Sequence, residues 1–235
     1  NFNGVAKFNG TNWTGFNVPY LGNSGFYVND AIYFNNELYL GGNFSLSTGE
    51  EDLIYYHTGQ WQKPSAGIYG SMSAVKKLEV YKNRLYIGGL IFKGDGNVGN
   101  MLIAWDGNNL LPVGDGLKDN LNTYGSAQVH DMMIFKDKLY IAGTFNYAGN
   151  IFSCGLTIFD GNTFCSLNKT PQLSVGLDAV GKYHDTLYVS GSLKYLNDSI
   201  MNIGKYIGNG TSDTCSVFYD VGIKEISQNV VNTFI

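Results

Sequence analysis

The chain has 235 residues, a formal net charge of −4 and only 14% charged residues, and Arg84 is its single arginine. A surface that binds nucleic-acid phosphates needs clustered basic residues, and a membrane-spanning helix needs about 18 consecutive apolar residues. The sequence has neither feature, which argues against both functions. The 31 glycines and 17 tyrosines, with only 4 prolines, instead favour an exported all-β domain.

The first predicted element is a β-hairpin at residues 5–13, in which two short apolar segments flank the turn Asn9-Gly10. Asparagine or aspartate followed by glycine suits a tight turn because both residues tolerate positive φ. Hairpins of the same kind follow along the chain, and their turn glycines are Gly59, Gly107, Gly161 and Gly208.

A second kind of hairpin alternates with the first and contains the phrase Leu-Tyr-x-Gly-Gly, whose first glycine becomes Ala or Ser in the later copies. The phrase begins at Leu38, Leu85, Leu139 and Leu187. Its period of roughly 50 residues is typical of four-stranded propeller blades rather than of helical solenoids. We expect the paired glycines where a side chain would obstruct a neighbouring backbone or where a turn needs positive φ, and not as ligand contacts.

Two hairpins, one of each kind, make one four-stranded blade. A hairpin alone is only marginally stable in water, so the blades must stack, which accounts for nearly unbroken apolar runs such as Leu85-Tyr86-Ile87. The sequence therefore predicts an all-β fold, a β-propeller of four-stranded antiparallel blades with four complete blades and part of a fifth. The propeller is expected at 1–220, with blades at about 28–61, 75–110, 129–165 and 178–219 and a partial blade at 1–13.

Two phrases carry a resemblance to a known family. Leu-Tyr-x-Gly-Gly-x-Phe, as at Leu38–Phe44, and Trp-Asp-Gly, as at Trp105–Gly107, resemble the kelch-like propeller repeats of large secreted and surface proteins of Bacteroidetes. The segment Val221–Glu225 is similar to the stretch that precedes their C-terminal type IX secretion sorting domain, although no Tyr-Pro-Asn-Pro-like start of that domain follows. The resemblance implies a protein secreted or held on the outer cell surface, with 221–235 as a linker or closing strand towards an absent sorting domain.

The three cysteines, Cys154, Cys165 and Cys215, allow three pairings, which the sequence leaves open. We favour a disulfide between Cys154 and Cys165, and the alternative is three buried thiols. No Cys-x-x-Cys pair is present, so no structural zinc site and no cofactor are predicted.

Candidate site residues lie on the first strand of each blade, where propellers place their channel mouth. Alignment on the Leu-Tyr phrase makes one set of positions equivalent, namely Asn29, Lys76, His130 and Asp178. The next position holds Asp30, Lys77, Asp131 and Ala179. The predicted binding residues are Asn29, Asp30, Lys76, His130, Asp131 and Asp178.

Carboxylates from different blades could also converge as they do in glycosidases, where two of them lie about 5–10 Å apart. Asp30, Asp131 and Asp178 are the candidates, and Glu79 adds one more. Aspartates commonly begin strands in solvent, and the chain has few glutamates that could serve as a general acid of raised pKa. We therefore assign no catalytic residue.

The leading functional hypothesis is a non-catalytic binding or adhesion module for a glycan or a protein at the cell surface, carried on a rigid scaffold. Tyrosines near the connections suit such ligands, and these are Tyr20, Tyr27, Tyr69, Tyr124 and Tyr147. One alternative is a glycosidase-like propeller enzyme. A second is a structural subunit of a surface or secretion-associated complex, which needs no pocket.

Overall fold

The computed structural model describes residues 4–18, 27–46, 49–50, 52–64, 67–70, 74–120, 126–153, 155–166, 175–194, 200–206 and 218–219. Within these ranges the chain is built of antiparallel β-strands, and the only helical element is a short 3-10 turn, η1 (Lys93–Asp95). No helix of this described part is long and apolar enough to cross a membrane. The predicted all-β fold class is confirmed.

Sixteen of the strands form four successive four-stranded units, in each of which the strands pair in chain order. Sheet I consists of β3 (Tyr27–Phe34), β4 (Glu37–Asn43), β7 (Leu53–His57) and β8 (Gln60–Gln62). Sheet II consists of β9 (Ala74–Tyr81), β10 (Arg84–Leu90), β11 (Leu102–Trp105) and β12 (Leu110–Pro112). Sheet III consists of β14 (Gln128–Phe135), β15 (Lys138–Thr144), β18 (Leu156–Phe159) and β19 (Phe164–Ser166). Sheet IV consists of β20 (Val175–Tyr183), β21 (Thr186–Lys194), β22 (Ile200–Tyr206) and β23 (Phe218–Tyr219).

One backbone ladder pair, Thr144 with Gly176, joins β15 of sheet III to β20 of sheet IV. Seven further strands of the described residues lie outside these units. A separate hairpin contains β1 (Gly4–Phe8) and β2 (Trp13–Asn17). Two smaller groups are β5 (Ser45–Leu46) with β6 (Gly49–Glu50), and β13 (Leu117–Lys118) with β16 (Tyr147–Ala148) and β17 (Ile151–Phe152).

Two-residue turns connect the first and second strands of the sheets. In sheet I the turn residues Asn35 and Asn36 have φ of 51° and 64°, as both central residues of a type I′ turn require. Lysines take this left-handed conformation in later sheets, at Lys82 and Lys136. The predicted hairpin around Asn35-Asn36 is therefore confirmed, and its twist matches that of the strands it joins.

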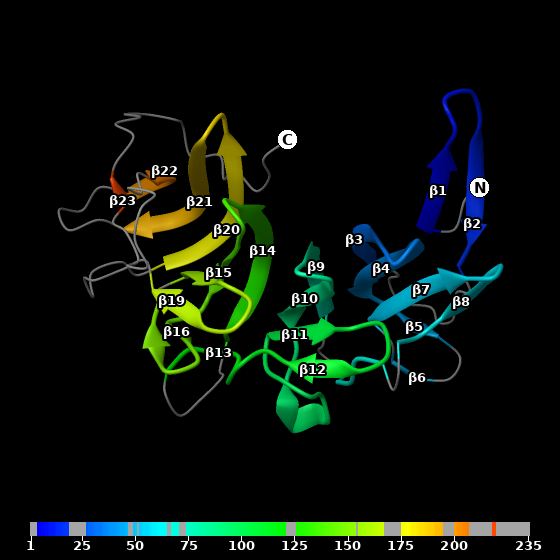
Figure 1. Ribbon diagram of the computed structural model, residues 1–235, viewed down its shortest axis with the longest axis horizontal. Helices are drawn as coiled ribbons and strands as arrows, with labels where there is room; N and C mark the ends of the chain where they lie inside the picture. The colour runs from blue at the N-terminus through cyan, green and yellow to red at the C-terminus, as the bar shows by residue number, and fades with distance from the viewer. Residues whose placement is uncertain are drawn as a thin grey trace.

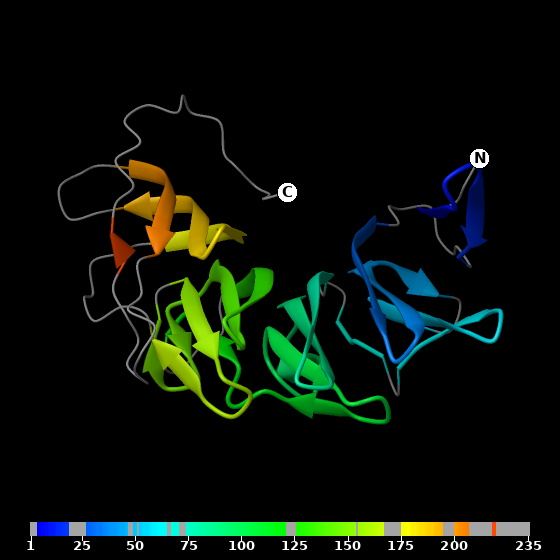
Figure 2. The same cartoon turned by 45° about the horizontal axis from the view of Figure 1, so that its top comes forward.

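The sheets follow one another along an arc, with the first strand of each beside the first strand of the next (Figures 1 and 2). Strand β9 lies against both β3 and β14, and β14 lies against β20. The β1–β2 hairpin is at one end of this arc and sheet IV is at the other (Figure 1).

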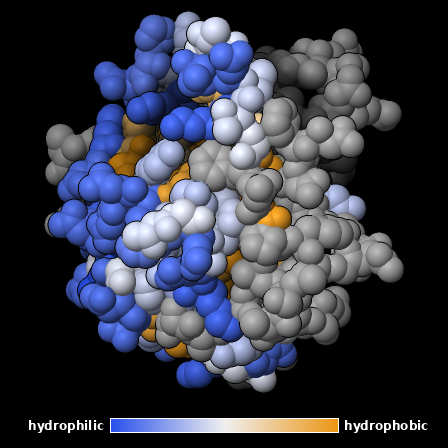
Figure 3. All heavy atoms as spheres, turned by 90° about the vertical axis from the view of Figure 1, so that its right-hand side faces the viewer, coloured by the Kyte–Doolittle hydropathy of each residue, from blue (hydrophilic) through white to orange (hydrophobic). Residues whose placement is uncertain are grey.

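Apolar side chains fill the space between consecutive sheets. Phe34 and Tyr39 of sheet I pack with Ile103 and Trp105 of sheet II, and similar clusters join sheets II with III and III with IV. Each fully buried aliphatic or aromatic side chain contributes about 1.5–3 kcal/mol, so these layers supply the main stabilisation of the arc. Seen from the end with the β1–β2 hairpin, hydrophilic residues cover most of the described surface and hydrophobic ones show in recesses (Figure 3).

The paired glycines sit where backbones approach closely. A Cβ on the second glycine of sheet II, Gly89, would lie 2.0 Å from the carbonyl oxygen of Ala74, and Gly42 and Gly143 are similarly confined. A Cβ on the first glycine, Gly88, would lie 2.6 Å from Cγ1 of Val129 in the next sheet. The predicted obstruction of a neighbouring backbone is confirmed, and the first glycine additionally permits sheet-to-sheet packing.

Candidate functional site

Each first strand contains a β-bulge opposite its glycine pair. In sheet II, Gly88 pairs with Lys77 and Gly89 pairs with Val75, which leaves Lys76 outside the ladder. The same register shift leaves out one residue in each of the other sheets, and these are Asn29, His130 and Asp178. The four positions aligned from the sequence are thus structurally equivalent, and a bulge turns their side chains away from the regular pleat.

Two of the bulge residues bind the neighbouring sheet. Asn29 donates from Nδ2 to the carbonyl oxygen of Val75, at 2.7 Å. His130 Nδ1 lies 2.8 Å from the carbonyl oxygen of Leu177 and 3.5 Å from Oδ1 of Asp178. Because a carbonyl can only accept, Nδ1 of His130 carries the proton. Asn29 and His130 are therefore partly occupied in holding sheets together, and Lys76 is exposed.

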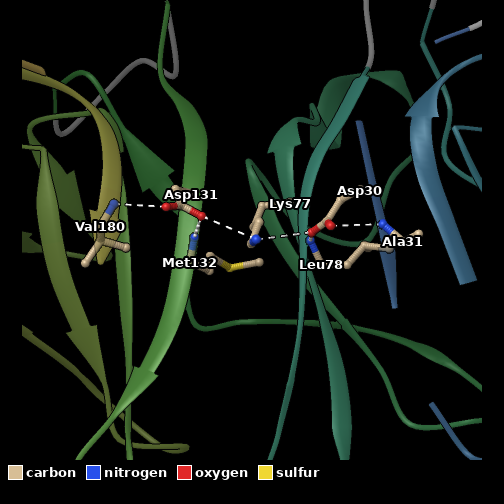
Figure 4. Close-up of polar contacts among 7 residues, drawn as sticks. All are labelled: Asp30, Ala31, Lys77, Leu78, Asp131, Met132 and Val180. Atoms are coloured by element: carbon tan, nitrogen blue, oxygen red, sulfur yellow. Dashed lines mark hydrogen bonds and ion pairs between the residues drawn. The ribbon is translucent and has the colours of Figure 1, made fainter. Parts of the chain in front are cut away.

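In sheets I and III the residue after the bulge is an aspartate, and each of these aspartates binds its own sheet and a neighbouring sheet. Asp30 Oδ1 accepts the N–H of its own neighbour Ala31, and Oδ2 accepts the N–H of Leu78 in sheet II, both at 2.9 Å. Asp131 repeats this arrangement with the N–H groups of Met132 and, in sheet IV, Val180, again both at 2.9 Å (Figure 4).

These contacts give a hydrogen-bond acceptor to backbone N–H groups on edge strands. Strand β9 is the edge of sheet II, so the outward N–H of Leu78 has no ladder partner on that side. An unpaired backbone donor costs about 1–3 kcal/mol when it is buried. Asp30 and Asp131 each remove that cost from the next sheet and fix its position along the arc.

Lys77 holds the equivalent position in sheet II and lies between the two aspartates. Its Nζ is 3.5 Å from Oδ2 of Asp30 and 3.6 Å from Oδ1 of Asp131 (Figure 4). Burial alone would lower the pKa of Lys77, but the carboxylates of Asp30 and Asp131, with Glu79, raise it above its ordinary value. Burial raises the pKa of Asp131, while the N–H of Val180 and the Lys77 ammonium oppose that rise.

Glu79 lies two residues after Lys77 on β9, close enough to the cluster of Asp30, Lys77 and Asp131 to interact with its charges. Burial raises the pKa of Glu79 to about 7, Lys77 and the N–H of Val80 lower it, and the charges of Asp30 and Asp131 add to the rise. Glu79 is thus the member of the cluster whose charge changes near neutral pH. Three carboxylates and one ammonium meet here, so protonation of Glu79 relieves an excess of negative charge.

This titration predicts a pH dependence of stability that Glu79→Gln removes. The folded pKa of about 7 exceeds the ordinary 4.5, so folding takes up a proton between these values and stability falls as pH rises through that window. We expect wild type to lose about 1–2 kcal/mol more than Glu79→Gln between pH 5 and 8, after allowance for partial exposure. Urea unfolding of both proteins at several pH values measures the difference. Parallel curves for the two proteins would contradict the assignment.

Two of the carboxylates considered for catalysis, Asp30 and Asp131, hold neighbouring sheets together. Both oxygens of Asp30 and of Asp131 accept backbone N–H groups, and Lys77 spans the pair. They are not the solvated strand-start residues that the sequence suggested, because their side chains are only 22% and 19% exposed. Asp178 is more open and faces His130.

Among the described residues, no group of three or more His, Cys, Asp and Glu side chains is arranged to hold a metal ion. Cys165 is disulfide-bonded, and the other two cysteines, Cys154 and Cys215, lie outside the described residues. Its pairing with Cys154 therefore stays a prediction.

The aromatic residues proposed for ligand binding divide into three groups. Tyr27 and Tyr69 are exposed, as the binding hypothesis requires. Tyr147 packs edge-on against Phe152. Tyr20 and Tyr124 lie outside the described residues.

The role of Asp30 and Asp131 as links between sheets was not predicted. The only signal in the sequence was their equal distance from the Leu-Tyr phrase. No protein-family model matches this chain, and no curated protein matches it. Its function is therefore inferred from its own residues.

Proposed function

We propose that this chain forms the blades of a β-propeller and serves as a non-catalytic binding module for a glycan or protein outside the cell. Support for the propeller comes from the four successive antiparallel units and from their first strands lying side by side. A shared bulge at the same register in every first strand supports it too, because it makes the units repeats of one structure.

The bulge residues carry the binding proposal. At equivalent positions they present an amide, an ammonium, an imidazole and a carboxylate, from Asn29, Lys76, His130 and Asp178. The hydrogen bonds of Asn29 and His130 to the next sheet hold these side chains in fixed orientations. A row of different polar groups on rigid strands suits a polar ligand such as a glycan, because little ordering is needed on binding.

The location outside the cell is supported by two features. Cys165 is disulfide-bonded, and disulfides persist in oxidising compartments. The repeat phrases resemble those of secreted and surface propellers of Bacteroidetes, and Val221–Glu225 resembles the segment before their sorting domain.

A glycosidase-like enzyme is the second candidate, and one observation favours it. The pKa of Glu79 is raised to about 7 beside Asp30 and Asp131, as a general acid near a second carboxylate would require. Against this, both aspartates use both of their oxygens on backbone donors. These bonds account for the position of both aspartates by a structural role alone.

A glycan array with the purified protein, followed by titration of any glycan that binds, tests the proposal. We expect Lys76→Ala to weaken binding at least tenfold, which corresponds to about 1.4 kcal/mol. Lys182→Ala is the matched control, because Lys182 is exposed on the first strand of sheet IV but lies near its turn end.

The first of three outcomes would restrict the proposal to a protein ligand, and the other two would contradict it. The array could show no bound glycan, which rejects the glycan ligand. Equal weakening by Lys76→Ala and Lys182→Ala would reject the bulge row as the site. Release of sugar from a bound glycan, abolished in Glu79→Gln, would support the enzyme instead.

A further inference from the structure

One aromatic contact recurs between consecutive sheets. The tyrosine of the Leu-Tyr phrase in one sheet meets the aromatic residue that precedes the outer turn of the next sheet. Trp105 of sheet II donates its indole N–H to the hydroxyl of Tyr39 in sheet I, at 3.1 Å. Phe159 of sheet III lies 5.8 Å from the ring of Tyr86 in sheet II. Trp105 and Phe159 are at most 5% exposed.

The residue that ends each first strand takes part in the same layer. Phe34, Tyr81 and Phe135 are at most 7% exposed, and each belongs to the cluster shared with the following sheet. Tyr81 also donates its hydroxyl to the carbonyl oxygen of Asp137 in the turn of sheet III, at 2.8 Å. In sheets I, II and III this residue is therefore covered by the sheet that follows.

Sheet IV presents the same residues uncovered. Tyr183 is equivalent to Phe34, Tyr81 and Phe135, yet it is 67% exposed. Tyr188, the tyrosine of the fourth Leu-Tyr phrase, is half-buried, whereas Tyr39 is fully buried. The outward flank of sheet IV therefore has one half of the recurrent contact.

The β1–β2 hairpin has the other half. Phe8 precedes the turn Asn9-Gly10 just as Trp105 precedes Asp106-Gly107 and Phe159 precedes Asp160-Gly161. The turns are capped alike, because the side chains of Asn9, Asp106 and Asp160 each accept two backbone N–H groups. Phe8 is nevertheless 51% exposed. Trp13, whose ring centroid lies 5.0 Å from that of Phe8, is 61% exposed.

We propose that the β1–β2 hairpin of one copy docks on the outward flank of sheet IV of a second copy, with Phe8 against Tyr183 and Tyr188. The two halves lie at opposite ends of the arc within one chain, which leaves each of them open to a second copy (Figures 1 and 2). The contact repeats an interface that already joins consecutive sheets in this structure. It is head-to-tail, and it is independent of the ligand proposed above.

Sedimentation velocity and light scattering of the purified chain over a wide concentration range test the association. Wild type is expected to form species larger than a monomer as concentration rises. Tyr183→Ser and Phe8→Ser should each stay monomeric where wild type associates, with association at least tenfold weaker. Tyr33→Ser is the matched control, since Tyr33 is equally exposed on a first strand but is not at the recurrent position. Circular dichroism of all variants verifies folding, which substitutions at exposed positions leave intact.

Mixing the two single variants gives the sharpest result. Tyr183→Ser retains an intact hairpin and Phe8→Ser retains an intact flank, so their equimolar mixture should form a dimer that grows no further. A mixture that stays monomeric, or association that Tyr33→Ser also abolishes, would overturn the proposal. So would a wild type that remains monomeric at every concentration, which is the result expected if the hairpin closes on sheet IV of its own chain.

Discussion

Gly89→Ala is expected to destabilise the protein by at least about 3 kcal/mol, enough to unfold much of the population of a marginally stable domain. The added Cβ would lie 2.0 Å from the carbonyl oxygen of Ala74 and 3.0 Å from the amide nitrogen of Lys76. Both obstacles are backbone atoms of the bulge, so no side-chain rotation relieves the clash. The bulge must open, and the pairing of β9 with β10 is lost at that point.

Urea unfolding followed by tryptophan fluorescence measures this loss. Gly94→Ala is the matched control, because a Cβ at Gly94 meets no atom within 4 Å. We expect the control to stay within about 1 kcal/mol of wild type. Equal midpoints for Gly89→Ala and Gly94→Ala would show that the bulge is not as tight as described.

Asp131→Asn is expected to cost about 2–3 kcal/mol although it preserves the size of the side chain. Asparagine has one acceptor oxygen, so its NH₂ group would face the N–H of either Met132 or Val180. The substitution also removes one of the two carboxylates that neutralise Lys77. One backbone donor, in sheet III or in sheet IV, and the half-buried ammonium of Lys77 would therefore each lose a partner.

The control for this change is Asp115→Asn, in an exposed turn of the same chain. A surface substitution of that kind usually stays within about 0.5 kcal/mol. If chemical unfolding gives the two variants the same stability, Asp131 does not join the sheets energetically, whatever its distance from Val180.

Much of the fold could be predicted because its determinants are local and repeated. The Leu-Tyr phrase with its glycines defined the second strands, and Asn35-Asn36 defined a turn by its tolerance of positive φ. Alignment on the phrase also placed Asn29, Lys76 and His130 at one register. The structure gives that equivalence a physical basis, since each is the unpaired residue of a bulge.

The contacts between sheets could not be predicted, because they join residues far apart in the chain. Asp30 binds an amide 48 positions away, and nothing near Asp30 in the sequence indicates Leu78 as a partner. Without that partner an aspartate at a strand start suggests a solvated residue or a catalytic carboxylate. For the same reason the exposure of Tyr183 was unforeseen, since its equivalents are buried by the neighbouring sheet and not by their own strand.

Amide hydrogen exchange measured by NMR in Asp30→Ala and Asp131→Ala, which remove both acceptor oxygens, tests most directly whether the sheets stand side by side through their first strands. Asp131→Ala should accelerate exchange at Val180, and Asp30→Ala should accelerate it at Leu78, each beyond any change shared by the other core amides. Exchange that rises at neither amide, or rises equally at both in each variant, would contradict this arrangement of the sheets.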